Sequence, residues 1–372
     1  MYKIGVVGIG HWFGRLHEGM KSIGGLEVKK ALGTKSYESK AKMLDSFGIS
    51  KDMYLTTDSS GKIPKGFFED IDAVHISDPN MYHMQQAISS LENGKKAIVE
   101  KSFAVNKAEF DSFTKYLKDN KKENDAYLHL HYMHKQPTLA LKGMIGQLTK
   151  ENGKISEVRS TFFESENEED ARRSWLFGVD NGGLFMDWIH PFEVIYYASN
   201  PKFGTIAELG LYMVNRKYSK NDPTGIYAST QIHGKYFSTN AKMNVNIAKG
   251  VEERFAQKAM RIIFESGKCV TLLFAGSEKE FGKSNRGTIE IGDIRSGQYS
   301  AQKREELKGE NSSEIFVKQI LNLCSGKNES LTIDEISDIF APQWEYQHML
   351  DTANLTIEPR AVRRFIEKGY GL

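Results

Sequence analysis

One pair of charges interrupts an apolar stretch, AIVEKSFAV at residues 97–105, where Glu100 and Lys101 stand side by side. A lysine inside a buried run is costly unless a partner or solvent receives its ammonium group. If the run is a strand of a parallel sheet, the pair falls at its carboxyl end, where such sheets bind ligands. There Lys101 could hydrogen-bond a substrate oxygen and a ribose hydroxyl. The simpler alternative is a surface lysine paired with Glu100.

A second polar group follows a glycine pair in NGGLFMDWIHPFE at residues 181–193. Asp187, His190 and Glu193 stand three residues apart, which places them near one face of a helix. A histidine between two carboxylates can be oriented and made more basic, as a general base requires. Metal binding is less favoured, because the HExxH spacing and cysteine ligands are missing. The alternative is a buried histidine next to Pro191 with both acids on the surface.

A glycine-rich turn, GIGHWFG at residues 8–14, directly follows the first apolar run. Glycines between a strand and a helix let backbone amides approach a pyrophosphate at the positive end of the helix. The third glycine, Gly14, is displaced by one residue from the G-x-G-x-x-G spacing. The alternative is an ordinary strand-to-helix turn. The predicted dinucleotide-binding residues of this turn are Gly8, Gly10, His11, Trp12 and Phe13.

The end of the second predicted strand, ALGTKSY at residues 31–37, indicates which dinucleotide is bound. An enzyme that uses NAD usually places an acid here to bind the ribose 2′-hydroxyl, but no acid occurs before Glu38. Thr34, Lys35 and Ser36 offer donors and a positive charge, which suit a 2′-phosphate. We therefore predict NADP in preference to NAD. The alternative is that Lys35 is a plain surface lysine and that either cofactor is used.

The elements that would position these residues follow from the alternation of apolar runs and helical patterns in the first third of the chain. Strands are predicted at residues 3–10, 26–32, 71–77, 96–101 and 125–133, and helices at 13–23, 38–48, 80–94 and 108–120. A strand and helix alternation of this kind is typical of a doubly wound parallel sheet. The sequence therefore predicts an α/β Rossmann domain at residues 1–128.

The pattern changes in the remaining chain, residues 129–372. Longer strands are predicted at 157–164, 205–215 and 226–234, and a hairpin at 260–274 with Ser266 and Gly267 at its turn. A helix is predicted at 312–326, a capping box at 332–335, a helix end or kink at Pro342, and a further helix that starts near Pro359. We expect an α+β domain with a large, mostly antiparallel sheet and a helical C-terminal tail.

Composition excludes several classes of protein. The chain has 372 residues, a net charge of +2 and scattered lysines and arginines, so no basic face for nucleic acid is expected. No apolar stretch approaches the roughly 18 residues of a membrane span. The N-terminus has no signal-peptide pattern. Cys269 and Cys324 lie far apart, which favours a reducing cytoplasm.

Four motifs, taken together and in order, resemble the Gfo/Idh/MocA oxidoreductases, the family of glucose–fructose oxidoreductase and inositol dehydrogenase. The first is GIGHWFGRLH (8–17), and the second is AVHISDPNMYH (73–83), in which Pro79, Asn80 and His83 match. VEKSF (99–103) resembles the Glu-Lys-Pro motif with serine in place of proline. NGGLFMDWIHPFE resembles the last motif, with three steps rather than four from Asp187 to His190.

The resemblance implies a Rossmann domain joined to an open antiparallel sheet that serves as a homodimer or homotetramer interface. It implies NAD or NADP as cofactor and hydride transfer at a hydroxyl-bearing carbon of a sugar or polyol. Lys101 and His190 would be the acid/base pair, assisted by Asp187, and no metal would be needed. Pro79, Asn80, His83, Glu100 and Lys101 would contact the cofactor. His134, Arg173 and Trp175 are weaker candidates for contacts with sugar hydroxyls.

Two alternatives remain open at this point. The chain could be a nucleotide sensor that has lost its chemistry, although the presence of both Lys101 and His190 argues against this. It could also act on a bile pigment or a dihydrodiol, which would require an apolar pocket. A polar pocket that bears a tryptophan favours a sugar.

Overall fold

The computed structural model describes residues 1–58, 60–164, 187–200, 203–213, 230–238, 241–249, 256–274, 287–295, 298–309, 312–327 and 331–352. Contacts divide the chain into two compact units, Met1–His131 with Glu310–Ile333, and Tyr132–Gly309 with Asp334–Leu372. The domain boundary at 128/129 stays a prediction. The contacts differ from it in one respect, because they group residues 310–333 with the first unit rather than with the C-terminal tail.

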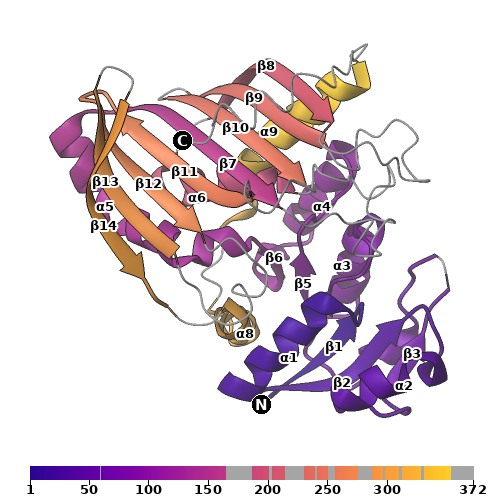
Figure 1. Cartoon of the computed structure of the whole chain (residues 1–372). Helices are drawn as coiled ribbons and strands as arrows, with labels where there is room; N and C mark the ends of the chain where they lie inside the picture. Colours follow the sequence, from indigo (N-terminus) through magenta and orange to yellow (C-terminus); the bar gives the residue numbers. More distant parts are fainter. Residues whose placement is uncertain are drawn as a thin grey trace. The chain divides into compact units, whose positions relative to one another are not determined.

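The first unit is built on a six-stranded sheet in the order β3-β2-β1-β4-β5-β6, in which every pair is parallel (Figure 1). The strands are β1 (Tyr2–Val7), β2 (Leu26–Gly33), β3 (Tyr54–Thr56), β4 (Ala73–Ile76), β5 (Lys96–Glu100) and β6 (Ala126–His129). The order reverses between β1 and β4, the position at which doubly wound sheets bind ligands. The predicted Rossmann fold is confirmed.

Helices alternate with these strands along the chain, as expected of βαβ units. They are α1 (His11–Ile23), α2 (Tyr37–Ser46), α3 (His83–Glu92) and α4 (Lys107–Asp119), with short 3-10 turns η1 (Lys65–Phe68), η2 (Asn80–Tyr82) and η3 (Glu123–Asp125). Helix α8 (Ser312–Cys324), from the distant C-terminal part of the chain, packs on α1 and completes the core of this unit. Gly19 permits this close approach, since a Cβ there would lie 2.3 Å from the carbonyl oxygen of Ser313.

The second unit contains an eight-stranded sheet in its described part, in the order β14-β13-β12-β11-β7-β10-β9-β8. Its strands are β7 (Ile155–Glu164), β8 (Phe203–Met213), β9 (Thr230–Ser238), β10 (Lys242–Lys249), β11 (Gln257–Phe264), β12 (Lys268–Phe274), β13 (Gly287–Arg295) and β14 (Gln298–Leu307). All pairs are antiparallel except β10 with β7. The expected mostly antiparallel sheet is confirmed.

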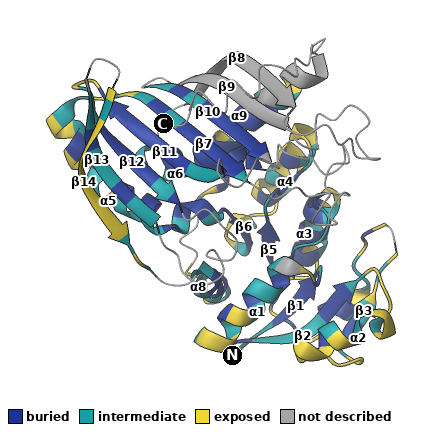
Figure 2. Cartoon of the chain, viewed as in Figure 1, coloured by how far each residue is buried: buried dark blue, intermediate teal, exposed yellow. Residues whose placement is uncertain are grey.

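Among the described residues, three helices and one turn belong wholly or mainly to the second unit: η4 (His131–His134), α5 (Gln136–Asn152), α6 (Ile189–Ser199) and α9 (Ile333–Thr352). Figure 2 shows the central strands β7, β11 and β12 largely buried, whereas β14 at the edge of the sheet is largely exposed. Four consecutive charged residues on β14, from Lys303 to Glu306, keep this exposed edge polar. No described helix is long and apolar enough to cross a bilayer.

The predicted local features are largely present, with one correction. The hairpin turn at Ser266 and Gly267 joins β11 to β12, and the φ of Gly267 is +84°. Pro342, by contrast, does not end its helix, because α9 continues through it to Thr352, and the predicted alternative of a kink stays a prediction. Phe340 and Trp344 on either side of the proline are buried. Pro359 lies outside the described residues.

Candidate active site

The turn between β1 and α1 has the geometry that a dinucleotide pyrophosphate requires. Gly8 has a φ of +83°, and a Cβ at this position would lie 2.5 Å from the backbone nitrogen of Asp78. Gly10 has extended backbone, and a Cβ there would enter open space. Helix α1 begins without a side-chain cap and without an acidic residue in its first turn. An anion can therefore approach the positive end of this helix, so the residues present fit the phosphates of NAD(P).

The aromatic residues that follow have different roles. Phe13 is fully buried and packs edge-on against Phe47, with ring centroids 5.0 Å apart, so a cofactor could contact only its backbone. The Arg15 guanidinium lies 4.6 Å from the ring centre of Trp12. Gly14 donates its N–H to the carbonyl of Gly10, which makes it part of the first helical turn. The side chain of His11 lies outside the described part of the structure.

The turn after β2, residues 34–36, is positively charged. Burial lowers the pKa of Lys40, and the positive charge of Lys35 lowers it further. Glu38, the first acid after β2, forms an ion pair with Lys51 at 2.6 Å. The Ser36 hydroxyl caps α2 by accepting from the Ser39 N–H at 3.4 Å. Thr34 follows β2 directly and is exposed.

His83 joins the loop after β4 to the loop after β5. Its Nε2 lies 2.8 Å from the carbonyl oxygen of Asp78, and its Nδ1 lies 2.8 Å from that of Ser102. Pro79 precedes η2, and Asn80 is buried at its start. Lys101 is half-buried directly after β5, and its peptide bond to Ser102 is cis. The structure thus brings the second and third motifs together beside Lys101.

Glu100 places its carboxylate among histidines in the core, and its contact with the cofactor stays a prediction. Its Oε1 lies 3.0 Å from Nδ1 of His129 and 3.6 Å from Nε2 of His75. Phe316 of α8 stacks on the ring of His129 at 3.9 Å. Burial raises the pKa of Glu100, but His129 and His75 outweigh this effect and hold it below its usual range. The lower pKa means that Glu100 remains a carboxylate.

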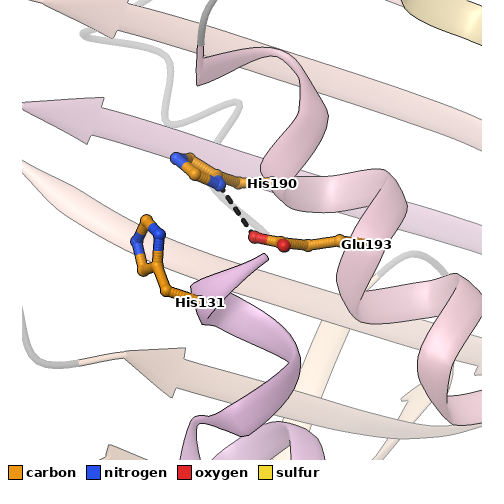
Figure 3. Close-up of side chains that lie close together, drawn as sticks. All are labelled: His131, His190 and Glu193. Carbon is orange, nitrogen blue, oxygen red and sulfur yellow. Dashed lines mark hydrogen bonds and ion pairs between the residues drawn. The ribbon is translucent and has the colours of Figure 1, made fainter. Parts of the chain in front are cut away.

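The side chains of the second unit that are best arranged for acid–base chemistry lie at the start of α6. Nδ1 of His190 lies 2.8 Å from Oε1 of Glu193 (Figure 3). Nε2 of His190 lies 3.4 Å from Oδ1 of Asp187. All three side chains are buried, so the alternative with both acids on the surface is wrong. Because a carboxylate only accepts, Glu193 holds a proton on Nδ1, and Nε2 beside Asp187 can take up a further proton.

Aromatic side chains enclose His190. The ring of Tyr132 lies 4.4 Å from it and that of Phe162 lies 6.3 Å from it, between ring centres. Phe274 contacts both Tyr132 and Phe162. The backbone N–H of Tyr132 also donates to Glu193 at 3.1 Å. His190 is buried, and a buried environment strengthens its interactions with the two carboxylates.

Two further charged residues were not predicted from the sequence. Lys258 on β11 forms an ion pair with Glu164 at the end of β7. Burial alone lowers the pKa of Lys258, but Glu164, Tyr132 and Asp187 outweigh it and raise the value. Burial also raises the pKa of Tyr132, against the effect of Lys258. No local pattern identifies these residues, because their partners come from separate elements.

The remaining predicted substrate residues are placed only in part. His134 is half-buried at the end of η4. Arg173 and Trp175 lie outside the described residues. Lys101 belongs to the first unit, whereas Asp187 and His190 belong to the second.

Comparison with solved structures shows the same fold over nearly the whole chain. Aldose-aldose oxidoreductase from Caulobacter crescentus, complexed with glycerol, is 13% identical with a TM-score of 0.70, covering 95% of this chain and 98% of that chain. KijD10, a 3-ketoreductase from Actinomadura kijaniata complexed with NADP and TDP-benzene, is 11% identical with a TM-score of 0.68, at 91% and 94% coverage. GenD2 from gentamicin A biosynthesis, in complex with NAD, is 14% identical with a TM-score of 0.68, and both chains are covered to 95%.

The comparison with family models agrees with the geometry of the β1–α1 turn. A search of curated proteins found no match. Residues 2–124 match the model described as the oxidoreductase family with an NAD-binding Rossmann fold, GFO_IDH_MocA. The match includes the glycine turn, the loop that holds His83, and Lys101. The NAD-binding Rossmann domain that residues 2–124 form is therefore similar to that of the Gfo/Idh/MocA oxidoreductase family.

Proposed function

We propose that this NAD(P)-dependent oxidoreductase acts on a hydroxyl-bearing carbon of a sugar, a polyol or a related small molecule. The observation that carries the proposal is the pairing of His190 with two buried carboxylates, at 2.8 and 3.4 Å. A secondary alcohol needs a base to accept its proton as it is oxidised, and this arrangement supplies one. An oxidoreductase of carbohydrates among the structures with this fold supports the substrate class.

His190 accepts the alcohol proton at Nε2 in this proposal. Glu193 keeps the proton on Nδ1 and fixes the ring, while Asp187 stabilises the positive charge that develops on the imidazole. Lys101 donates a hydrogen bond to the same substrate oxygen and stabilises the negative charge on it. When bound, the nicotinamide ring supplies the acceptor for the two electrons of the carbon–hydrogen bond. Gly8, Gly10 and the first turn of α1 would hold its pyrophosphate.

We also propose a preference for NADP, because Lys35 follows β2 and its charge lowers the pKa of Lys40, while Glu38 is paired with Lys51. Lys35→Ala should weaken NADP+ binding by about tenfold, since one charge-assisted hydrogen bond is lost. The same change should leave NAD+ binding unaltered. Calorimetric titration of both nucleotides measures this, with the exposed Lys42→Ala on α2 as control. Equal affinities of the unmodified protein for both nucleotides would remove the preference.

Activity is tested by mixing the protein with NADP+ or NAD+ and a panel of aldoses and polyols while absorbance at 340 nm is followed. We expect turnover with at least one sugar, and its loss in Lys101→Ala and in His190→Asn. Both variants should still bind the nucleotide. Nucleotide binding without turnover of any sugar or polyol would instead support the sensor, and turnover restricted to apolar substrates would support a dihydrodiol or a bile pigment.

The assembly and the compartment are further parts of the proposal. A homodimer or homotetramer through the C-terminal sheet is expected from the family, and light scattering after gel filtration tests it. Cys269 and Cys324 are both free thiols, as a reducing cytoplasm would leave them.

A further inference from the structure

We propose that Lys258 is a positioning residue, which balances the charge around His190 so that the imidazole can serve as a base near neutral pH. The effect of Lys258 on the kinetics rests on the proposed function, but its effect on the protonation of His190 does not. Lys258 lies on β11, far in sequence from the motifs described above. Its role follows from the sheet register and from the charges gathered at one end of β7.

The sheet register places Lys258 beside the aromatic residues that surround His190. Lys258 pairs across the sheet with Phe162 on β7 and with Phe274 on β12. Opposite residues of neighbouring strands project on the same face, so the lysine stem lies between these two rings. The ring of Tyr132 packs on both phenylalanines at 5.2 Å and on His190 at 4.4 Å. Lys258 therefore lies next to the same aromatic cluster as the histidine.

The charges of the cluster are unequal. Glu164, Asp187 and Glu193 contribute three carboxylates, and Lys258 contributes one ammonium, which forms an ion pair with Glu164. The interactions of Lys258 with Asp187 and Tyr132 extend its influence towards His190. Without Lys258, three carboxylates would act on the imidazole unopposed by this cation. They would hold a proton on His190 to higher pH, where the ring could no longer accept one from a substrate.

Further titratable side chains near this cluster belong to η4. Tyr132 on η4 faces His190, and burial keeps its hydroxyl protonated by raising its pKa. His131 and His134 are the further titratable residues of η4. The pKa of Lys258 is raised, so this residue stays charged at every pH at which the enzyme would be assayed. A constant charge is what a residue needs if it is to bias the protonation of another.

Two substitutions, one that removes a positive charge and one that removes a negative charge, test the inference. Lys258→Met removes the cation with little change in length, and Glu164→Gln removes one carboxylate while keeping a hydrogen-bond acceptor. The titration midpoint of His190 is followed by NMR of protein labelled at histidine Cε1, and its resonance is assigned by its absence in His190→Asn. We expect the midpoint to rise by about one pH unit in Lys258→Met and to fall in Glu164→Gln, as close charges do.

Controls separate the charge effect from a loss of packing. Lys258→Arg retains the cation and should restore the original midpoint. Lys268→Met removes a lysine that is paired with Asp293 at 3.3 Å elsewhere on the same sheet, and it should leave His190 unchanged. If Lys258→Met does not fold, Glu164→Gln and the double variant Lys258→Met/Glu164→Gln decide the question. Unmoved midpoints, or shifts of the same sign in the two single variants, would overturn the inference.

The kinetic experiment uses the sugar that the unmodified protein oxidises fastest with NADP+. The acidic limb of its profile of kcat/KM against pH should move to higher pH in Lys258→Met, by the same amount as the NMR midpoint. The rate at high pH should be retained, which a merely structural defect would not produce. A protein that oxidises no sugar contradicts the proposed function but leaves the NMR result to decide the role of Lys258. Active variants with identical profiles contradict the role of Lys258 alone.

Discussion

Nδ1 of His190 lies 2.8 Å from Oε1 of Glu193, which stands three residues further along α6. Glu193 is fully buried, and the same oxygen accepts the backbone N–H of Tyr132 at 3.1 Å. One carboxylate oxygen therefore joins the helix to the turn η4 and sets the tautomer of the histidine. The ring is oriented before any substrate binds, and preorganisation of this kind is what a general base requires.

Glu193→Gln should abolish most turnover while preserving the fold. The amide oxygen can still accept from Tyr132, but the negative charge that supports a protonated His190 is lost. We expect kcat to fall by about 10²- to 10⁴-fold, by analogy with other histidines that lose their orienting carboxylate. Steady-state kinetics measure the change, and circular dichroism checks the fold. Glu151→Gln, an exposed glutamate on α5, is the control, and equal activity in both variants would contradict this role of Glu193.

Substitution of the two turn glycines should separate folding from cofactor binding. Gly8→Ala introduces a Cβ 2.5 Å from the backbone of Asp78 at a φ of +83°, so we expect a lower Tm. Gly10→Ala places its methyl group in open space and should leave Tm unchanged. It should nevertheless weaken NADP+ binding by tenfold or more, roughly the effect of displacing one good hydrogen bond. Thermal shift with and without NADP+ measures both, and unaltered binding in Gly10→Ala would place the pyrophosphate elsewhere.

Glu100 should stabilise the first unit in a pH-dependent manner. The pKa of Glu100 in the folded protein lies below its ordinary value of 4.5. Its contribution is therefore present above pH 4.5 and declines as pH falls below that value. Glu100→Gln should lower the free energy of unfolding by about 2 kcal/mol at pH 7, since a hydrogen bond between His129 and a charged carboxylate is lost. Urea unfolding at pH 7 and pH 4 measures this loss, with Glu92→Gln, a change at an exposed residue, as the control. If the loss of stability in Glu100→Gln were larger at pH 4 than at pH 7, the prediction would be contradicted.

Phe316→Ala should destabilise the Rossmann unit, although the residue is distant from it in sequence. The ring stacks on His129 at 3.9 Å and lies 5.4 Å from His75, between ring centres. Removal of a buried phenylalanine costs about 3–5 kcal/mol. Chemical unfolding measures the loss, and Gln319→Ala on the same helix is the control. Equal stability of the two variants would show that α8 adds little to this unit.

Much of the Rossmann unit could be predicted from the sequence because its determinants are local. The run from Ile4 to Val7 is apolar and fully buried, as a strand covered on both faces must be. The spacing of Asp187, His190 and Glu193 similarly identifies one helical face, and α6 places all three together. Local sequence did not decide between a helix end and a kink at Pro342, and the structure shows that α9 continues through the proline.

The sequence by itself determined the two kinds of sheet, the glycine turn and the spacing of the acids around His190, since each depends on residues within a few positions of one another. Only the tertiary structure decided that Glu100 faces His129 and His75, that Phe316 covers them, and that Lys258 joins Glu164 beside Tyr132. These contacts depend on strand order and register, which bring together residues that are far apart in the chain. Register arises from the packing of whole sheets and helices, and no local pattern encodes it.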